Sequence, residues 1–303
     1  MEPGDVAPVE SYLDTYYVDT GMYATAEYGS VFIIDAERPA MIDTGIGTNH
    51  QYLLDALDEI GIARDELEVI APTHVHLDHA GGAGYLAEEC PNADVYIHEI
   101  GAPHLVDPSR LVEGTKRAVG GQWQHYVEPK PVPEDRIVEL SGGDEIDLGD
   151  RVLDVIHAPG HAPHQVVFHD ADAGGVFTAD ATGIYVPKLD VVRETTPPPN
   201  FDYEQCLADV ETIRDLEPET LMYGHFGPYS GDVDAKLEEY EDVLDDWVDT
   251  VAAALDEYGD ADAAAEYLAE NAGMADLWGT EKAHEETKMN ARGVLRYLKQ
   301  SRD

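Results

Sequence analysis

The stretch Thr73-His74-Val75-His76-Leu77-Asp78-His79-Ala80-Gly81-Gly82 decides how the rest of this sequence is interpreted. An apolar strand is predicted just before it, at Val69–Pro72, and a helix just after it, from Gly81 to Glu89. The polar side chains in between therefore lie on a turn at a strand end, where they can converge on one point. Imidazole and carboxylate groups are ligands for zinc, iron and other transition metals. The sequence thus predicts a metal site that uses His74, His76, Asp78 and His79.

Three more candidate ligands follow predicted strands further along the chain. His161, Asp180 and His225 each come at, or shortly after, the end of a short apolar segment. Upstream, the segment Met41-Ile42-Asp43-Thr44-Gly45 places Asp43 after another such strand. The ordered set, with its central H-x-H-x-D-H run, resembles the signature of the metallo-β-lactamase superfamily over roughly residues 20 to 230.

The resemblance implies a fold and a division of the ligands. Members of this superfamily are α/β proteins that fold as a four-layer αββα sandwich and hold one or two metals at one edge. Two divalent ions are therefore expected, with zinc ahead of iron or manganese. By analogy, the ligands are His74, His76 and His161 for the first metal, Asp78, His79 and His225 for the second, and Asp180 as the bridge between them.

Such a site implies hydrolytic chemistry. Three protein ligands leave an open position on each ion, which is typical of catalytic rather than structural sites. A hydroxide shared by two metals is a strong nucleophile near neutral pH, because metal binding lowers the pKa of water from about 15.7 to about 7. The ions would also polarise the substrate carbonyl. Asp78 is the candidate catalytic residue, since it could steer the hydroxide or pass a proton.

Four other residues are candidates for roles around the ligands. Asp43 either orients a ligand imidazole through a hydrogen bond or is an ordinary turn residue before Gly45. His164 is either a hydrogen-bond donor in the pocket or a structural histidine at the start of a strand. Tyr185 and Tyr223 lie near the ends of ligand-bearing segments. Either tyrosine could donate a hydrogen bond to the substrate or its oxyanion, or could simply pack in the core.

The branches of the superfamily differ in features that this sequence has or lacks. Antibiotic-cleaving β-lactamases typically lack the bridging Asp and often use Cys as a ligand, whereas Asp180 is present here and no Cys adjoins a ligand. Flavodiiron proteins usually have Glu at the position of His76 and carry a flavin domain. The glyoxalase II-like (hydroxyacylglutathione hydrolase-like) and lactonase-like branches remain. We therefore expect a dinuclear hydrolase of an ester, thioester or lactone bond. The alternatives are a mononuclear iron persulfide dioxygenase-like oxidoreductase and a non-enzymatic binding module.

Acidic residues dominate the composition, with 63 Asp and Glu against 18 Lys and Arg and a net charge of −45. This charge repels phosphate backbones and anionic lipid, so we expect a small-molecule substrate and neither nucleic-acid nor membrane partners. Molar salt shortens the Debye length to about 3 Å and screens the self-repulsion, which favours a halophile over an ordinary acidic protein. The expected location is cytoplasmic, in a high-salt cytosol. The sequence has only two cysteines, and we find neither a signal peptide nor an apolar run of membrane length.

The chain divides into a predicted catalytic domain over residues 1–230 and a C-terminal helical appendage over residues 231–303. An apolar stripe at i, i+3, i+4 spacing runs from Leu237 to Leu255 on an otherwise acidic helix. This stripe must be buried against the sandwich, the mouth of the active site or a second subunit. The last of these arrangements would give a homodimer through the C-terminal helices.

Two segments within the predicted catalytic domain look irregular. Residues 99–135 and 181–200 are rich in proline or glycine and are predicted to be long loops that wall the active site. Residues 136–178 are predicted to supply the strands of the second sheet, and residues 1–20 a lead-in with one edge strand.

Overall fold

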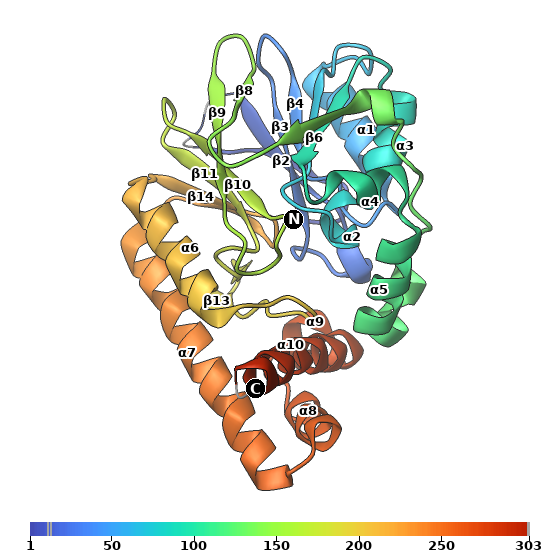
Figure 1. Cartoon of the computed structure of the whole chain (residues 1–303). Coiled ribbons are helices and arrows are strands. Elements are labelled where there is room, and N and C mark those ends of the chain that lie inside the picture. Colours follow the sequence, from blue (N-terminus) through green and yellow to red (C-terminus); the bar gives the residue numbers. More distant parts are fainter. Residues whose placement is uncertain (11, 13, 302–303) are drawn as a thin grey trace.

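Two β-sheets form the centre of the molecule, and helices cover their outer faces (Figure 1). The computed structural model describes residues 1–10, 12 and 14–301. The first sheet has the strand order β1 (Val6–Pro8), β2 (Thr15–Asp19), β3 (Ser30–Ile34), β4 (Ala40–Ile42), β5 (Val69–Ala71), β6 (Asp94–His98), β7 (Ile137–Leu140). The second sheet has the order β15 (Gly227–Tyr229), β14 (Thr220–Tyr223), β11 (Gly175–Ala179), β10 (Val166–Asp170), β9 (Val152–His157), β8 (Glu145–Asp147).

Strand β3 explains why the first sheet is covered on both faces. Its side chains are buried along its whole length, and successive side chains point to opposite faces. Val31 and Ile33 pack in one apolar core with Leu53 of helix α1 (His50–Ile60). Phe32 and Ile34 pack in another core, together with residues of the second sheet. The all-apolar strand therefore separates a helical layer from the layer between the sheets.

The second sheet alternates in the same way. Phe168 and Phe177 face the first sheet, and the rings of Phe177 and Phe32 meet edge to face at 5.4 Å. Val167 and Val176 face outward and pack against the helices on that side. The α/β fold with an αββα sandwich and a C-terminal helical region is thus confirmed. Its covering helices are α3 (Ala83–Glu89), α4 (Ala102–Val106) and α5 (Ser109–Val119) on the side of α1, and α6 (Tyr203–Asp215) and α7 (Val233–Tyr258) on the other.

The C-terminal region continues from α7 into α8 (Ala261–Glu270), α9 (Ala275–Trp278) and α10 (Thr280–Gln300). Leu237, Tyr240, Leu244 and Val251 of the apolar stripe are buried in the same core as Val176 of the second sheet. The stripe therefore packs against the sandwich and the neighbouring helices within one chain. A homodimer through these helices stays a prediction.

The prediction of a long loop over residues 99–135 is wrong, because much of the segment is helical. Helices α4 and α5 are followed by the 3-10 turns η2 (Gly120–His125) and η3 (Glu134–Arg136). Pro103 lies in the first turn of α4, and Pro108 is the N-cap of α5. Proline is tolerated at these positions because the first N–H groups of a helix have no intrahelical partner. The prolines thus begin helices here.

Residues 137–140, predicted for the second sheet, instead form β7 at the edge of the first sheet, parallel to β6. A parallel connection needs a long crossover, and the helical segment before β7 provides it. The predicted loop 181–200 contains the hairpin β12 (Ile184–Val186) and β13 (Val191–Arg193), whose turn places Asp190 at φ 53°. Asp tolerates this left-handed conformation without the glycine that usually signals such a turn.

The N-terminal segment supplies two paired strands, β1 and β2, where one edge strand was predicted. The 3-10 turn η1 (Met22–Ala24), the strand β15 and the short helix α9 were also not predicted from the sequence. Among the described residues, each helix is too short or too polar to span a membrane.

Candidate metal centre

The predicted ligands lie at one edge of the sandwich, on segments that follow strand ends. Strands β4 and β5 are parallel, so Asp43 and the turn with His74 leave the first sheet at the same edge. Strands β11 and β14 of the second sheet are also parallel, which brings Asp180 and His225 together. His161 lies on the connection between β9 and β10. The fold therefore gathers ligands from segments that are far apart in the sequence.

A short helix, α2 (Leu77–Ala80), shapes the first ligand turn. His76 is the N-cap of this helix. The His76 carbonyl accepts hydrogen bonds from the backbone N–H groups of His79 (3.0 Å) and Ala80 (2.8 Å). Gly224 leaves the space that His79 needs, because a Cβ atom at position 224 would lie 2.8 Å from Cε1 of His79. A side chain at position 224 would therefore displace a ligand.

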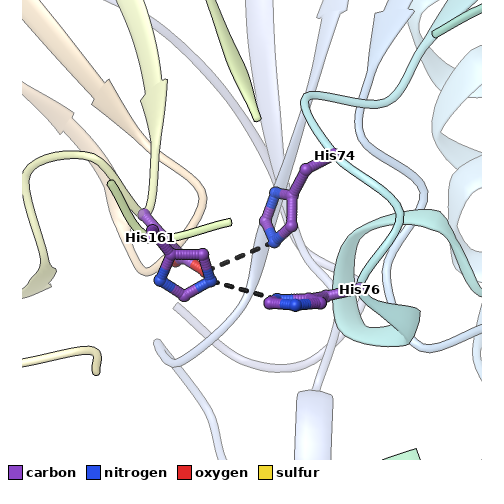
Figure 2. Close-up of side chains that lie close together, drawn as sticks. His74, His76 and His161 are labelled. Carbon is purple, nitrogen blue, oxygen red and sulfur yellow. Dashed lines mark hydrogen bonds and ion pairs between the residues drawn. The ribbon is translucent and has the colours of Figure 1, made fainter. Parts of the chain in front are cut away.

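The ligand atoms form two groups. The first ligand group is His74, His76, His161 and Asp180, and the second ligand group is Asp78, His79 and His225; within each group the atoms lie within 4.8 Å of one another. Figure 2 shows the imidazoles of His74, His76 and His161 turned toward one another.

Asp180 lies between the two groups. Its Oδ2 atom is 3.1 Å from Nε2 of His161 and 3.3 Å from Nε2 of His79. Its Oδ1 atom is 3.5 Å from Nε2 of His225. One carboxylate thus reaches ligands of both groups.

Several of these atoms lack the partners that buried polar groups normally have. Nε2 of His74 and Oδ1 of Asp180 have no hydrogen-bond partner among the described residues, which is rare for buried polar atoms. Ring nitrogens also face each other directly, at 3.0 Å between His161 and His76 and at 3.2 Å between His79 and His225. Cations placed among these atoms would satisfy them, so the residues present fit a metal site.

The protonation states suit metal binding as well. Burial, followed by the neighbouring histidines, lowers the pKa of His74 well below its ordinary value. The same causes lower the pKa of His76 to about 3, and burial lowers the pKa of His161. These three imidazoles are therefore neutral near pH 7, which is the form that binds metals.

Neighbouring charges outweigh the effect of burial on the pKa values of two other ligands, Asp180 and His79. Burial alone would raise the pKa of Asp180, but the histidines around it, His161 first, hold that pKa far below its usual range. Burial alone would lower the pKa of His79, but the carboxylates of Asp180 and Asp43 raise it above its ordinary value. The site therefore concentrates negative charge on Asp180, where it can meet a cation.

Four of the five ligand histidines have Nδ1 next to an oxygen acceptor. A proton on Nδ1 leaves the Nε2 lone pair free for a metal. His76 differs, because its Nδ1 faces the first ligand group. The acceptors are Thr73 Oγ1 for His74 (3.2 Å), Asp43 Oδ2 for His79 (2.8 Å), the Thr195 carbonyl for His161 (3.3 Å) and the Tyr28 carbonyl for His225 (3.0 Å).

Asp43 lies where an orienting residue is needed. One carboxylate oxygen accepts hydrogen bonds from the backbone N–H and the hydroxyl of Thr73, both at 2.8 Å. The other oxygen faces His79. Its backbone φ of 64° turns the chain sharply after β4. Asp43 therefore contacts a ligand and the residue before another ligand.

The other three candidates lie in two different places. His164 lines the cavity described below, where its Nδ1 accepts from the Val75 N–H at 3.4 Å, and burial lowers its pKa to about 2. Tyr185 and Tyr223 stack on each other at 5.4 Å and are not among the described residues that line the cavity. The Tyr185 hydroxyl donates to Asp190 at 3.2 Å. The positions of both tyrosines fit packing.

The ligand groups open into a cavity of about 230 Å³. Asp78 lies at its base, with 23 % of its side chain exposed. Most of the wall is apolar or aromatic, and Arg110 is the only Lys or Arg among its described residues. The wall includes Leu111, Ala118 and Val119 of α5, the segment Pro197–Pro199, Met289 of α10, and Tyr23, Tyr28 and Tyr126.

Sequence reasoning missed the contribution of α10 and of the tyrosines. Glu286 lines the cavity, and Lys282 lies behind it, bonded to both Glu286 and Tyr28. The i, i+4 spacing of Lys282 and Glu286 was visible in the sequence, but the same spacing is common in exposed helical ion pairs. Their burial depends on tertiary packing that the spacing does not reveal.

The likeness to known proteins agrees with this geometry. Residues 24–225 match the sequence profile of the metallo-beta-lactamase superfamily. The solved structure of an archaeal metallo-beta-lactamase superfamily protein from Sulfolobus tokodaii is 26% identical. It superposes with a TM-score of 0.64 and covers 77% of this chain and 86% of that chain.

Two named enzymes are similar over most of their length. The acyl-coenzyme A thioesterase MBLAC2 of Bos taurus is 26% identical over 72% of this chain and 80% of its own. An N-acyl homoserine lactonase of Bacillus thuringiensis is 23% identical over 69% of this chain and 75% of its own. These relatives support a hydrolase, and the converging ligand atoms support a metal site. Since the matching profile spans most of the chain and the ligands converge, the chain belongs to the metallo-beta-lactamase superfamily.

Proposed function

We propose that this protein is a dinuclear metal-dependent hydrolase of an ester, thioester or lactone bond in a small-molecule substrate. One observation carries the proposal: two groups of ligand atoms meet at a single carboxylate, Asp180, at the base of a cavity. Zinc is the first candidate for both ions, since imidazole and carboxylate are its ordinary ligands in catalytic sites.

Divalent ions bound in both groups would lower the pKa of a water molecule and polarise a carbonyl group. The chain's own residues do the rest. Asp180 holds the two ligand groups together, and its ionised state supplies the negative charge between them. The partly exposed carboxylate of Asp78 lies 3.9 Å from Nε2 of His225, on the cavity side of the second ligand group. It is therefore placed to accept a proton from a water molecule.

The cavity wall supports a substrate with an apolar acyl part. Side chains of α5 and the Pro197–Pro199 segment offer apolar surface beside the ligands, and burying such surface stabilises a bound acyl chain by about 0.8 kcal/mol per CH₂ group. Arg110 is the one Arg or Lys among the described residues of the wall, and its positive charge suits a leaving group with an anionic part. The thioesterase and lactonase named above both act on acyl substrates by name.

The test combines metal content with a substrate screen. The protein is purified in high salt, its metals are counted by elemental analysis, and its hydrolysis of acyl-coenzyme A thioesters, acyl lactones and nitrophenyl esters of increasing chain length is measured. Two zinc ions per chain, with a rate that rises with acyl length, are expected. Chelation should abolish the activity, and added zinc should restore it.

Two results would contradict the proposal. One iron per chain with oxygen uptake on a persulfide would favour the mononuclear oxidoreductase instead. A chain that binds a protein partner equally well with and without metal, and hydrolyses none of these substrates, would favour a binding module.

A further inference from the structure

One face of α10 is polar although it is buried. Lys282, Glu286 and Asn290 are spaced four residues apart, so they lie on one side of the helix, and they are only 6 %, 5 % and 1 % exposed. We call these three residues the polar stripe. Lys282 donates to one Glu286 oxygen, and the Asn290 amide donates to the other at 3.2 Å. Burying such an ion pair costs on the order of several kcal/mol per ion, so packing alone does not explain the stripe.

The Lys282 end of the stripe contacts the residue behind His225. The Lys282 ammonium donates to the Tyr28 hydroxyl at 2.9 Å and lies 4.1 Å from the centre of the Tyr28 ring. The ring of Trp278 packs edge-on against the same ring at 5.2 Å. The Tyr28 carbonyl in turn accepts from Nδ1 of His225 at 3.0 Å. Helix α10 thus fixes the residue that orients a ligand of the second group.

The Asn290 end contacts the segment behind His161. The Thr196 N–H donates to the Asn290 side chain at 2.8 Å, and the Asn290 amide donates to the Glu194 carbonyl at 3.3 Å. Thr195 lies between these two bonds, and its carbonyl accepts from Nδ1 of His161 at 3.3 Å. The same helix therefore fixes the backbone that orients a ligand of the first group.

Gly293 makes the second contact unusually close. A Cβ atom at this position would lie 1.8 Å from the Thr196 carbonyl oxygen and 2.8 Å from the Pro197 carbonyl carbon. The backbone of α10 is therefore in direct contact with the segment that carries Thr195. Any side chain at position 293 would push that segment away.

We propose that the polar stripe of α10 positions both His161 and His225 for metal binding. It acts through Thr195 and Tyr28, so its members are positioning residues. One helix of the C-terminal region thereby sets the ring orientation and tautomer of one histidine in each ligand group. The inference rests on the proposed two-metal site.

The first variant tests the Lys282 end. Lys282→Met with Glu286→Gln removes both charges together, so that no unpaired buried charge remains. We expect zinc affinity to fall by about 10- to 100-fold in the second ligand group, the range measured when partners of metal ligands are removed. Affinity in the first group should not change. Tyr28→Phe removes the same contact by another route and gives the same result if the double variant does not fold.

The second variant tests the other end. Gly293→Ala displaces the segment with Thr195, so we expect a similar loss of zinc affinity in the first ligand group only. Zinc affinities are measured on the full chain in high salt by competition with a chromophoric chelator. NMR spectra of ¹⁵N-labelled histidine assign each binding step to His161 or His225.

A matched control removes an ion pair of α10 that faces away from the site. Lys288 pairs with Glu266 of α8, so Lys288→Met with Glu266→Gln should leave both zinc affinities unchanged. The inference is overturned if the test variants keep both affinities while the melting temperature of the metal-free protein falls, or if the control loses zinc as they do. If the unaltered chain binds no zinc, both the proposed function and this inference fail. If that chain binds two ions and the variants match it, only the inference fails.

Discussion

The two halves of the metal site are held in different ways. In the N-terminal half, His74 and His79 lie on one turn, and Thr73 and Asp43 accept their Nδ1 protons. Both acceptors lie at the ends of adjacent parallel strands of the first sheet. In the C-terminal half, His161 and His225 come from separate loops and bond to backbone carbonyl groups. The segments that carry those carbonyl groups are fixed by α10.

This difference separates local from long-range construction. The N-terminal half needs one strand pair and one short motif, and its two Nδ1 acceptors lie no more than 36 residues from the histidines that they orient. The C-terminal half needs contacts such as Lys282 with Tyr28, which are 254 residues apart. We therefore expect the first half to tolerate changes in the C-terminal helices better than the second half does, provided that the fold persists.

The largest effect is expected from removing residues 231–303. This deletion would expose the apolar core shared by the second sheet and α7. Each large apolar side chain that loses its cover costs roughly 1.5–3 kcal/mol, and several of them together exceed the usual net stability of about 5–15 kcal/mol. The shortened chain should aggregate or be unfolded, as gel filtration and circular dichroism would show. A soluble monomer with a cooperative melting transition would contradict the difference between the two halves, because both halves of the site would then fold without α10.

The next largest effect is expected from removing salt. With a net charge of −45, self-repulsion should unfold the protein on dialysis from about 3 M to about 0.1 M KCl, since the Debye length grows from roughly 3 Å or less to about 10 Å. Hydrogen exchange should rise first in α7, where acidic residues crowd the outer face, and later in the first sheet. A melting temperature that does not depend on KCl would contradict the halophilic interpretation.

Asp180→Ala should abolish activity without unfolding the chain. This change removes the carboxylate that both ligand groups share, so metal content should drop and hydrolysis should fall by roughly 10³-fold or more, equivalent to about 4 kcal/mol in the transition state. Asp172→Ala, in the exposed turn between β10 and β11, is the matched control and should behave like the parent. An Asp180→Ala protein that keeps both metals and its activity would refute the bridging role.

Asp43→Asn should have an intermediate effect that is confined to one ligand. Asn tolerates the φ of 64° and can still accept from Thr73, but its amide would donate to Nδ1 of His79. The proton would then move to Nε2, so zinc affinity in the second ligand group should fall about 10- to 100-fold. Chelator competition would measure the loss, and Asp35→Asn serves as a control at an exposed turn. Unchanged affinity would show that Asp43 only shapes the turn.

The smallest effect is expected from Tyr185→Phe. The Tyr185 hydroxyl bonds to Asp190 and lies outside the cavity wall formed by the described residues. Because only an exposed hydrogen bond is lost, kcat and KM should both stay at the parent values, and stability should change by about 1 kcal/mol or less. A clear drop in kcat would contradict this expectation and would support a role for Tyr185 as a hydrogen-bond donor to the substrate.

Much of the first half of the site and of the fold could be predicted from the sequence. The motif from His74 to His79 can be recognised in the sequence because its ligands are closely spaced and because an apolar strand precedes it. The unbroken apolar run of β3 and the apolar stripe of α7 likewise indicate which side chains are buried. These features are local, so a short sequence pattern is enough to find them.

The remaining features depend on packing between distant segments. Pro103 and Pro108 suggested a loop because proline breaks helices in their interior, yet both lie at helix starts, where the penalty vanishes. Residues 137–140 joined the first sheet because the preceding helices carry the chain back across it. The roles of Tyr28, Thr195 and the polar stripe follow from contacts that local sequence patterns do not reveal.

The surroundings of Tyr28 and Thr196 also give the site two natural optical reporters. The indole of Trp278 packs on Tyr28, and the indole N–H of Trp247 donates to the Thr196 hydroxyl at 3.1 Å. One fluorophore therefore lies behind His225 and the other lies behind His161. A paramagnetic ion such as cobalt would quench the emission of the indole nearer to the group that it fills. The chain has a third tryptophan, Trp123. Variants that keep only Trp247 or only Trp278 would thus let fluorescence follow the filling of each half separately, in real time and without a label.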